Sequence, residues 1–183
     1  AESLVRTLRA VRTLGREFPL RLVVIGDGAA KPHLEKLAAE TNAYLGRNAV
    51  ILGGALVDPR PAYAMADIGV GMGGSVLRGM AFGKAAVVVG ERGFARPFTP
   101  QTAEQFYYKG MYGIGDGDPD NENLTGALRE LISIRQSLPD LGAFARRFVV
   151  ERHSIEVVSS LLNGLLVNAA ARPLRVGAAV VDS

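Results

Sequence analysis

The sequence predicts an α/β protein whose sheet is parallel and covered by helices on both faces. Apolar runs of strand length alternate with segments of helical period from residue 3 to residue 90, and glycine or proline marks most junctions between them. The run Ala85–Val89 contains only apolar residues, most of them β-branched, as expected of a strand buried on both faces. We therefore expect a Rossmann-like sheet of about five or six strands.

Helix and strand signals follow in order along the first part of the chain. Residues 3–14 form a predicted helix with its apolar side chains on one face. Its other faces carry Arg6, Arg9, Arg12 and Arg16. Residues 20–25 are a predicted buried strand and residues 49–52 the next predicted strand; between them a helix begins near Pro32 and ends at Gly46. A further short helix, opened by a proline, leads into the next strand.

Residues 67–90 have the pattern of a strand, a glycine turn, a short helix and a second strand. The first strand covers residues 67–71, and the turn Gly73-Gly74-Ser75 then offers the Ser75 hydroxyl as a helix N-cap. Gly83 ends the helix. In a parallel unit of this kind the helix starts at the carboxyl edge of the sheet, where its free N–H groups suit a phosphate.

The second half of the chain carries mostly helical signals. Helices are predicted over residues 101–109, 124–134, 141–151 and 154–167, and a short strand over residues 111–114. The polar segment 115–123 is predicted to be a solvated loop in which Asn121 or Asn123 caps the next helix, and Ser154 is the predicted cap of the last one. We expect one domain over residues 1–167 and a tail over residues 168–183.

Composition excludes several classes of protein. The 183 residues include no cysteine and two distant histidines, His33 and His153, so disulfides and the common metal motifs are not expected. The net charge is +3, but lysine and arginine are scattered, which argues against nucleic-acid binding. No apolar run is long enough to span a bilayer, so we expect a cytoplasmic protein; a basic face leaves peripheral membrane contact open.

The central segment resembles the donor site of retaining GT-B glycosyltransferases of the group 1, family 4-like type. Their pattern is Y-x-x-A-D, followed by E-x-F-G-x-x-x-x-E-A-M-A-x-G-K-P-V; this chain has YAMAD at residues 63–67 and GMAFGK at residues 79–84. The resemblance extends over residues 1–167. The two glutamates are absent: the first falls around Gly71, where no carboxylate occurs, and Arg78 stands in place of the second.

The resemblance implies a donor site built from three turns. The first faces the nucleotide sugar, the second contacts the nucleobase, and the third holds the diphosphate on helix amides without a metal. In this sequence they are Gly26, Asp27 and Gly28; Gly54 and Ala55; and Gly73, Gly74, Ser75 and Val76, with Arg78 where the family grips the ribose. For each turn, a purely structural role stays open. Four further basic residues would line a cleft that binds an anionic ligand or lie on a solvated surface: Lys84, Arg92, Arg96 and Lys109.

The resemblance also implies that the chain is the C-terminal, donor-binding half of a two-domain enzyme. Such an enzyme transfers a sugar from a nucleotide-sugar to an acceptor, needs no further cofactor, and has an N-terminal acceptor domain that we do not find here. We therefore expect a fragment that is inactive by itself. Two alternatives remain: a non-catalytic nucleotide-binding or interaction module, and an NAD-dependent domain. Apolar residues such as Leu161, Leu165 and Val176 would dock on the missing domain or form a homo-oligomer.

Overall fold

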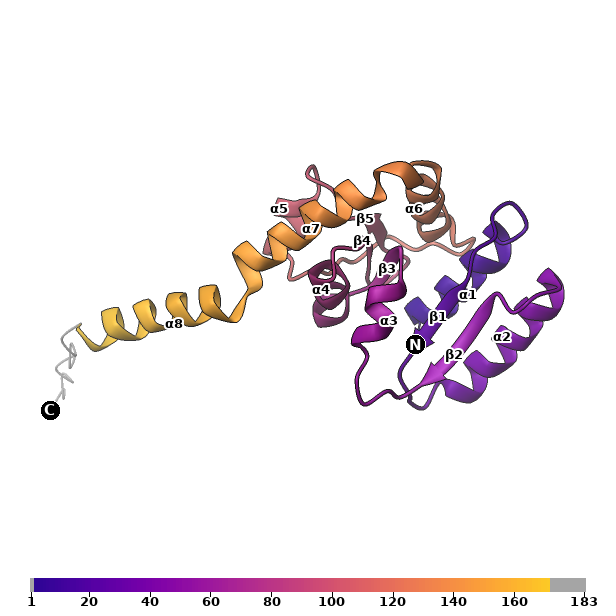
Figure 1. Ribbon diagram of the computed structural model, residues 1–183, viewed down its shortest axis with the longest axis horizontal. Helices are drawn as coiled ribbons and strands as arrows, with labels where there is room; N and C mark the ends of the chain where they lie inside the picture. The colour runs from indigo at the N-terminus through magenta and orange to yellow at the C-terminus, as the bar shows by residue number, and fades with distance from the viewer. Residues whose placement is uncertain (1, 172–183) are drawn as a thin grey trace, which may run out of the picture.

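The computed structural model describes residues 2–171 (Figure 1). Its helices and strands follow one another as α1 (Glu2–Leu14), β1 (Leu22–Ile25), α2 (Lys31–Leu45), β2 (Val50–Gly54), α3 (Arg60–Met65), β3 (Ile68–Gly71), α4 (Gly73–Ala81), β4 (Ala85–Val89), β5 (Ala95–Pro97), α5 (Ala103–Tyr108), α6 (Glu122–Ser133), the short 3-10 turn η1 (Arg135–Ser137), α7 (Leu138–His153) and α8 (Ile155–Ala170). This alternation confirms the predicted α/β class.

The strands form two sheets rather than the single sheet that we predicted. In one sheet β1 pairs with β2, and in the other the order is β3-β4-β5. Both β1–β2 and β3–β4 are parallel, whereas β5 runs antiparallel to β4. The chain reverses tightly after β4, where the Gly90 N–H donates to the Phe94 oxygen at 3.1 Å, and a short reversal can only produce an antiparallel neighbour. The predicted strand over residues 111–114 amounts to one bridge, between Glu91 and Ile114.

Strand β4 lies at the centre of the larger core, and all five of its residues are buried. Ala86 and Val88 pack into a cluster with side chains of α4, α5 and α7. Val87 and Val89 pack on the other face, against side chains of α1 and α6. The prediction of helices on both faces of the sheet is therefore confirmed here, and burial on both faces explains why β4 has no polar alternation.

The smaller sheet is covered on one face only. Leu22 and Val24 of β1 and Val50 of β2 pack against apolar side chains of α1 and α2. On the opposite face, Val23 and Ile51 are 43% and 39% exposed. The prediction that β1 is a buried strand was therefore wrong: Val23 is exposed and the other three residues are only half-buried, because α3 has only six residues, none of them buried.

The polar loop before α6 is anchored to α1 by a buried ion pair. Arg6, predicted to lie on an outer face, is 5% exposed, and its Nη2 lies 2.6 Å from the Asp118 carboxylate. The same carboxylate accepts the backbone N–H groups of Glu122 and Asn123 at 2.8 and 3.1 Å and so caps α6. Asn121 occupies the N-cap position, but its side chain bonds Arg6 instead. The predicted asparagine cap was therefore wrong, whereas the predicted solvated loop is confirmed for most of the segment, which is exposed apart from Gly115, Asp118 and Asn121.

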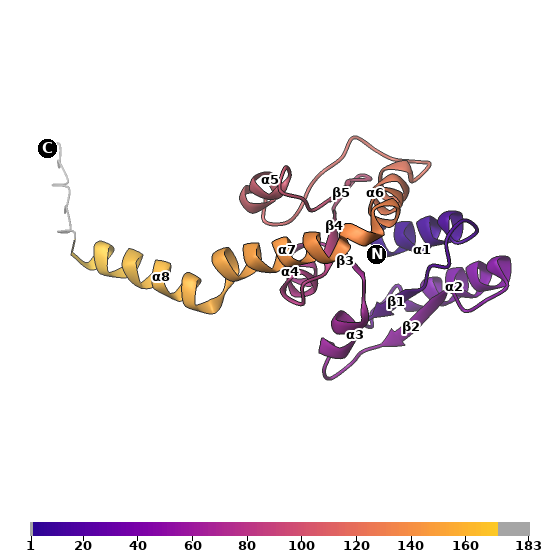
Figure 2. The ribbon, with the colours of Figure 1, turned by 45° about the horizontal axis from the view of Figure 1, so that its top comes forward.

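Helix α8 extends away from the rest of the chain, as both ribbon views show (Figures 1 and 2). The Ser154 hydroxyl accepts the N–H of Val157 at 3.3 Å, which confirms the predicted cap. No residue of α8 is buried, and Leu161 and Leu165 are 60% and 68% exposed. The helix continues to Ala170, past the boundary expected at residue 167, and position 176 lies outside the described residues. Within residues 2–171, no helix is both long and apolar enough to cross a membrane.

Candidate functional site

Helix α4 begins at Gly73, three residues earlier than the predicted Ser75 N-cap implies. Gly73, with φ of 51°, and Gly74 belong to the first turn of α4, so Ser75 is the third helical residue and not the N-cap. The Ser75 hydroxyl accepts the Met72 N–H at 3.2 Å and donates to the Met72 oxygen at 2.8 Å. The Gly73 N–H donates to the Met111 oxygen at 2.9 Å, whereas Gly74 is exposed and its N–H has no acceptor outside α4 among residues 2–171.

The side chains around this turn divide into buried and exposed ones. Val76 is 2% exposed and packs in the core, so it can contact a ligand only through its backbone. Arg78 is exposed and makes no ion pair or side-chain hydrogen bond within residues 2–171. A Cβ at Gly71 would lie 2.6 Å from the Ser75 Oγ, so the serine hydroxyl fills the space of a side chain at that position. A guanidinium that is free to donate suits an anion.

The other predicted turns lie together at the carboxyl ends of β1 and β2. The Gly26 N–H donates to the Gly54 oxygen at 2.7 Å, which joins the two segments. The Asp27 carboxylate accepts the Gly28 N–H at 2.8 Å and the Lys31 ammonium at 3.3 Å. These two bonds, the backbone one first, lower the pKa of Asp27 below its ordinary value. Ala55 follows the strand and is exposed.

The structure therefore assembles the predicted site as two groups on different sheets. No hydrogen bond among residues 2–171 joins the Gly26–Gly28 turn to the turn that opens α4. Sequence reasoning missed Lys31, although its position four residues after Asp27 on an opening helix is a recognisable signal for an ion pair. It also missed Met111, because a contact with Gly73 across 38 residues leaves no local pattern. Lys84, expected in an anionic cleft, donates to the Ala64 oxygen at 2.7 Å.

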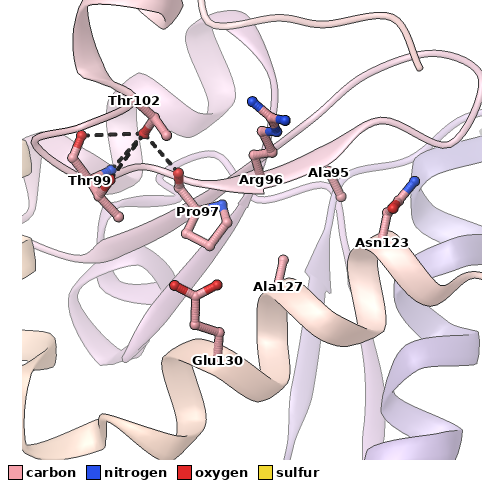
Figure 3. Close-up of a pocket in the computed structure, with 8 residues that line it drawn as sticks. All are labelled: Ala95, Arg96, Pro97, Thr99, Thr102, Asn123, Ala127 and Glu130. Atoms are coloured by element: carbon pink, nitrogen blue, oxygen red, sulfur yellow. Dashed lines mark hydrogen bonds between the residues drawn. The ribbon is translucent and has the colours of Figure 1, made fainter. Parts of the chain in front are cut away.

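A pocket of about 330 Å³ lies elsewhere, between β5 and α6 (Figure 3). Arg96 and Glu130 both line it, and Figure 3 shows Arg96 pointing away from Glu130. The Thr102 hydroxyl in its wall is engaged internally, since it donates to the Pro97 oxygen and accepts the Thr99 N–H, both at 2.9 Å. The exposed charged side chains of the pocket, Arg96 and Glu130, have opposite charges and do not point toward a common position. We therefore keep the glycine turns as the candidate site.

Comparison with known proteins gives matches to solved structures alone. No family model matches the chain, and no curated protein does. A glycosyltransferase from Rickettsia africae superposes with a TM-score of 0.67 and 15% identity, over 93% of this chain and 45% of that one. Anabaena HepE, solved with UDP, superposes with a TM-score of 0.63 and 13% identity, over 89% of this chain and 44% of that one. S. aureus TarM, also solved with UDP, superposes with a TM-score of 0.61 and 17% identity, over 86% of this chain and 31% of that one.

These identities are low, so the likeness concerns the fold. It extends over 86–93% of this chain. The chain spans less than half the length of each of the three solved structures. The chain therefore has a glycosyltransferase fold of the Rossmann-like type, and it corresponds to a part of such a fold.

Proposed function

We propose that this chain is the donor-nucleotide-binding domain of a glycosyltransferase that transfers a sugar from a nucleoside-diphosphate sugar to an acceptor. The observation that carries the proposal is the superposition of about nine tenths of the chain on a glycosyltransferase and on two proteins solved with UDP. The segment that resembles a donor site in sequence is the β3–α4–β4 unit, in which all five residues of β4 are buried. An acceptor domain would come from another part of a longer polypeptide.

The proposed ligand of α4 is the diphosphate of the donor. In the transfer, the bond from the sugar's anomeric carbon to the diphosphate oxygen breaks, a bond to an acceptor oxygen forms, and the acceptor loses its proton. Negative charge grows on the diphosphate, and the Gly74 N–H and the positive end of the helix dipole would stabilise it without a metal. Arg78 would add a guanidinium on the same short helix. We assign no catalytic residue.

One specific observation favours the alternative, a module that binds nucleotide without catalysis. No carboxylate occurs between Ile68 and Gly79, and the Ser75 hydroxyl fills the space beside Gly71. A general acid, base or nucleophile on this segment would require both a new side chain and a rearranged turn. Chemistry, if present, would therefore use groups on another element or another domain.

Calorimetric titration with UDP, GDP and ADP, with NAD as a control, tests the binding function. We expect one nucleoside diphosphate to bind saturably and Arg78→Ala to weaken it by about tenfold, the effect of one lost charged hydrogen bond. Arg135→Ala is the matched control, because Arg135 is also exposed and also forms no ion pair with the described residues. Absence of binding at millimolar nucleotide, or binding of NAD alone, would refute the proposal.

Turnover separates the enzyme from the module. A polypeptide that contains this chain and an acceptor domain would be incubated with each nucleotide-sugar, and release of the free nucleoside diphosphate would be measured. Release that depends on the acceptor supports the transferase. Saturable binding without any release supports the module.

A further inference from the structure

A row of arginines faces outward from the C-terminal half of α1. Arg9, Arg12 and Arg16 are spaced by three and four residues, so they share one face of the helix and of the turn that continues it. All three are exposed, in contrast to Arg6, which is buried. Helix α1 lies beside α2 at the end of the molecule away from α8 (Figures 1 and 2).

Tyr44 of α2 holds two of these arginines on one aromatic ring. The Arg12 Cζ lies 4.3 Å and the Arg16 Cζ 5.0 Å from the centroid of the ring. The Arg16 Nη1 also donates to the Tyr44 hydroxyl at 3.0 Å. Tyr44 is itself 44% exposed, so this arrangement is on the surface and does not serve the core. Two flexible cationic side chains are thereby kept close together and partly ordered.

The charge of this cluster is not balanced by a carboxylate. Within residues 2–171, no carboxylate oxygen lies within 4.0 Å of Arg9, Arg12 or Arg16, since none of them forms a salt bridge. Glu17, the adjacent acidic residue, is paired with Arg129 of α6 instead. The positive charge also has a further neighbour, because the Arg47 guanidinium donates to the Gly15 oxygen at 3.2 Å. Like charges held side by side without a counterion favour an anion between them.

We propose that Arg12 and Arg16, held by Tyr44 and assisted by Arg9, form a binding site for a phosphate group. Planar guanidinium forks donate in pairs to phosphate oxygens, and two of them on one ring match a dianionic phosphate or a diphosphate better than a single carboxylate. The site is separate from the turn that opens α4 and does not depend on the function proposed above. Its phosphate belongs to a soluble molecule or to a lipid headgroup.

The first test is titration with inorganic pyrophosphate at low ionic strength, followed by calorimetry and by NMR signals of the arginine side-chain N–H groups. We expect saturable binding that shifts the Arg12 and Arg16 signals and is weakened at least about tenfold in Arg12→Gln/Arg16→Gln. Arg60→Gln is the control, because that arginine is also exposed but is already paired with a carboxylate. The NMR signals of the Arg12 and Arg16 side chains report on this cluster alone, which separates its pyrophosphate binding from any binding at the turn that opens α4.

Sedimentation with vesicles distinguishes the sources of the phosphate. Phosphatidylcholine vesicles with and without phosphatidic acid are compared, the latter lipid carrying an exposed phosphate monoester. Binding to the acidic vesicles alone, lost in the double variant, assigns the site to a membrane surface; pyrophosphate binding without vesicle binding assigns it to a soluble phosphate. No binding of either probe overturns the proposal, as does an equal loss in Arg60→Gln.

Discussion

Replacing Arg6 with leucine is expected to lower the free energy of unfolding by about 3 kcal/mol or more, as for the loss of one partner of a buried ion pair. The guanidinium donates four hydrogen bonds, at 2.6 to 3.3 Å. Their acceptors are the side-chain oxygens of Asp118 and Asn121 and the backbone oxygens of Gly93 and Phe94. The substitution removes all four donors and leaves the Asp118 carboxylate, 6% exposed, without a counterion.

The expected loss is at the lower end of the range for buried pairs, about 3–5 kcal/mol. Asp118 keeps its two hydrogen bonds from the first N–H groups of α6, so the carboxylate is not wholly unsatisfied. For a domain of this size, each kcal/mol corresponds to about 2–4 °C in Tm, so the variant should melt roughly 6–12 °C lower. The loss reflects the unpaired charge left behind rather than the net stabilisation given by the pair.

Urea and thermal unfolding, followed by far-ultraviolet circular dichroism, measure the effect. Arg9→Leu on the same helix is the control and should change the free energy of unfolding by less than about 0.5 kcal/mol, since Arg9 is exposed and has no ion-pair partner among the described residues. The double variant Arg6→Leu/Asp118→Leu should lose less than the two single variants together. Equal effects of Arg6→Leu and Arg9→Leu would refute the assignment of a buried ion pair.

Three further predictions concern other parts of the chain. Gly142→Ala in α7 should lower the free energy of unfolding by about 1–3 kcal/mol, because the new Cβ would lie 1.9 Å from a backbone oxygen of the α4–β4 turn. Gly126→Ala in α6 should raise it by up to about 1 kcal/mol, because the space beside Gly126 is open. Urea unfolding of the two variants compares these effects. Burial first, and then the adjacent arginine, lower the pKa of His153, so the unfolded chain binds more protons and stability should fall as pH drops below about 6.5. The free energy of unfolding, measured by urea denaturation at several pH values across that range, should depend less on pH in His153→Gln. Leu161→Glu/Leu165→Glu should abolish concentration-dependent association in light scattering, if the exposed face of α8 pairs copies.

The sequence by itself determined the class of the fold and the ends of most elements. Local chemistry is sufficient there: Gly46 and Gly83 adopt positive φ where helices end, at 65° and 70°, because only glycine does so without strain. Ser154 caps α8, and the uninterrupted apolar run of β4 is buried on both faces. The turn that opens α4 was also recognisable, since glycines between a strand and a helix form a local pattern.

The tertiary structure alone decided how those elements are held together and which candidate site groups are accessible. Arg6 and Asp118 are 112 residues apart, so no window of sequence shows that one neutralises the other or that a polar loop is pinned to α1. The roles of Ser75 and Val76 likewise depend on their surroundings in the fold. The Ser75 hydroxyl is hydrogen-bonded to the Met72 backbone, and the Val76 side chain is buried in the core. The antiparallel direction of β5 and the shared ring under Arg12 and Arg16 are also nonlocal, because both arise from elements that meet only after folding.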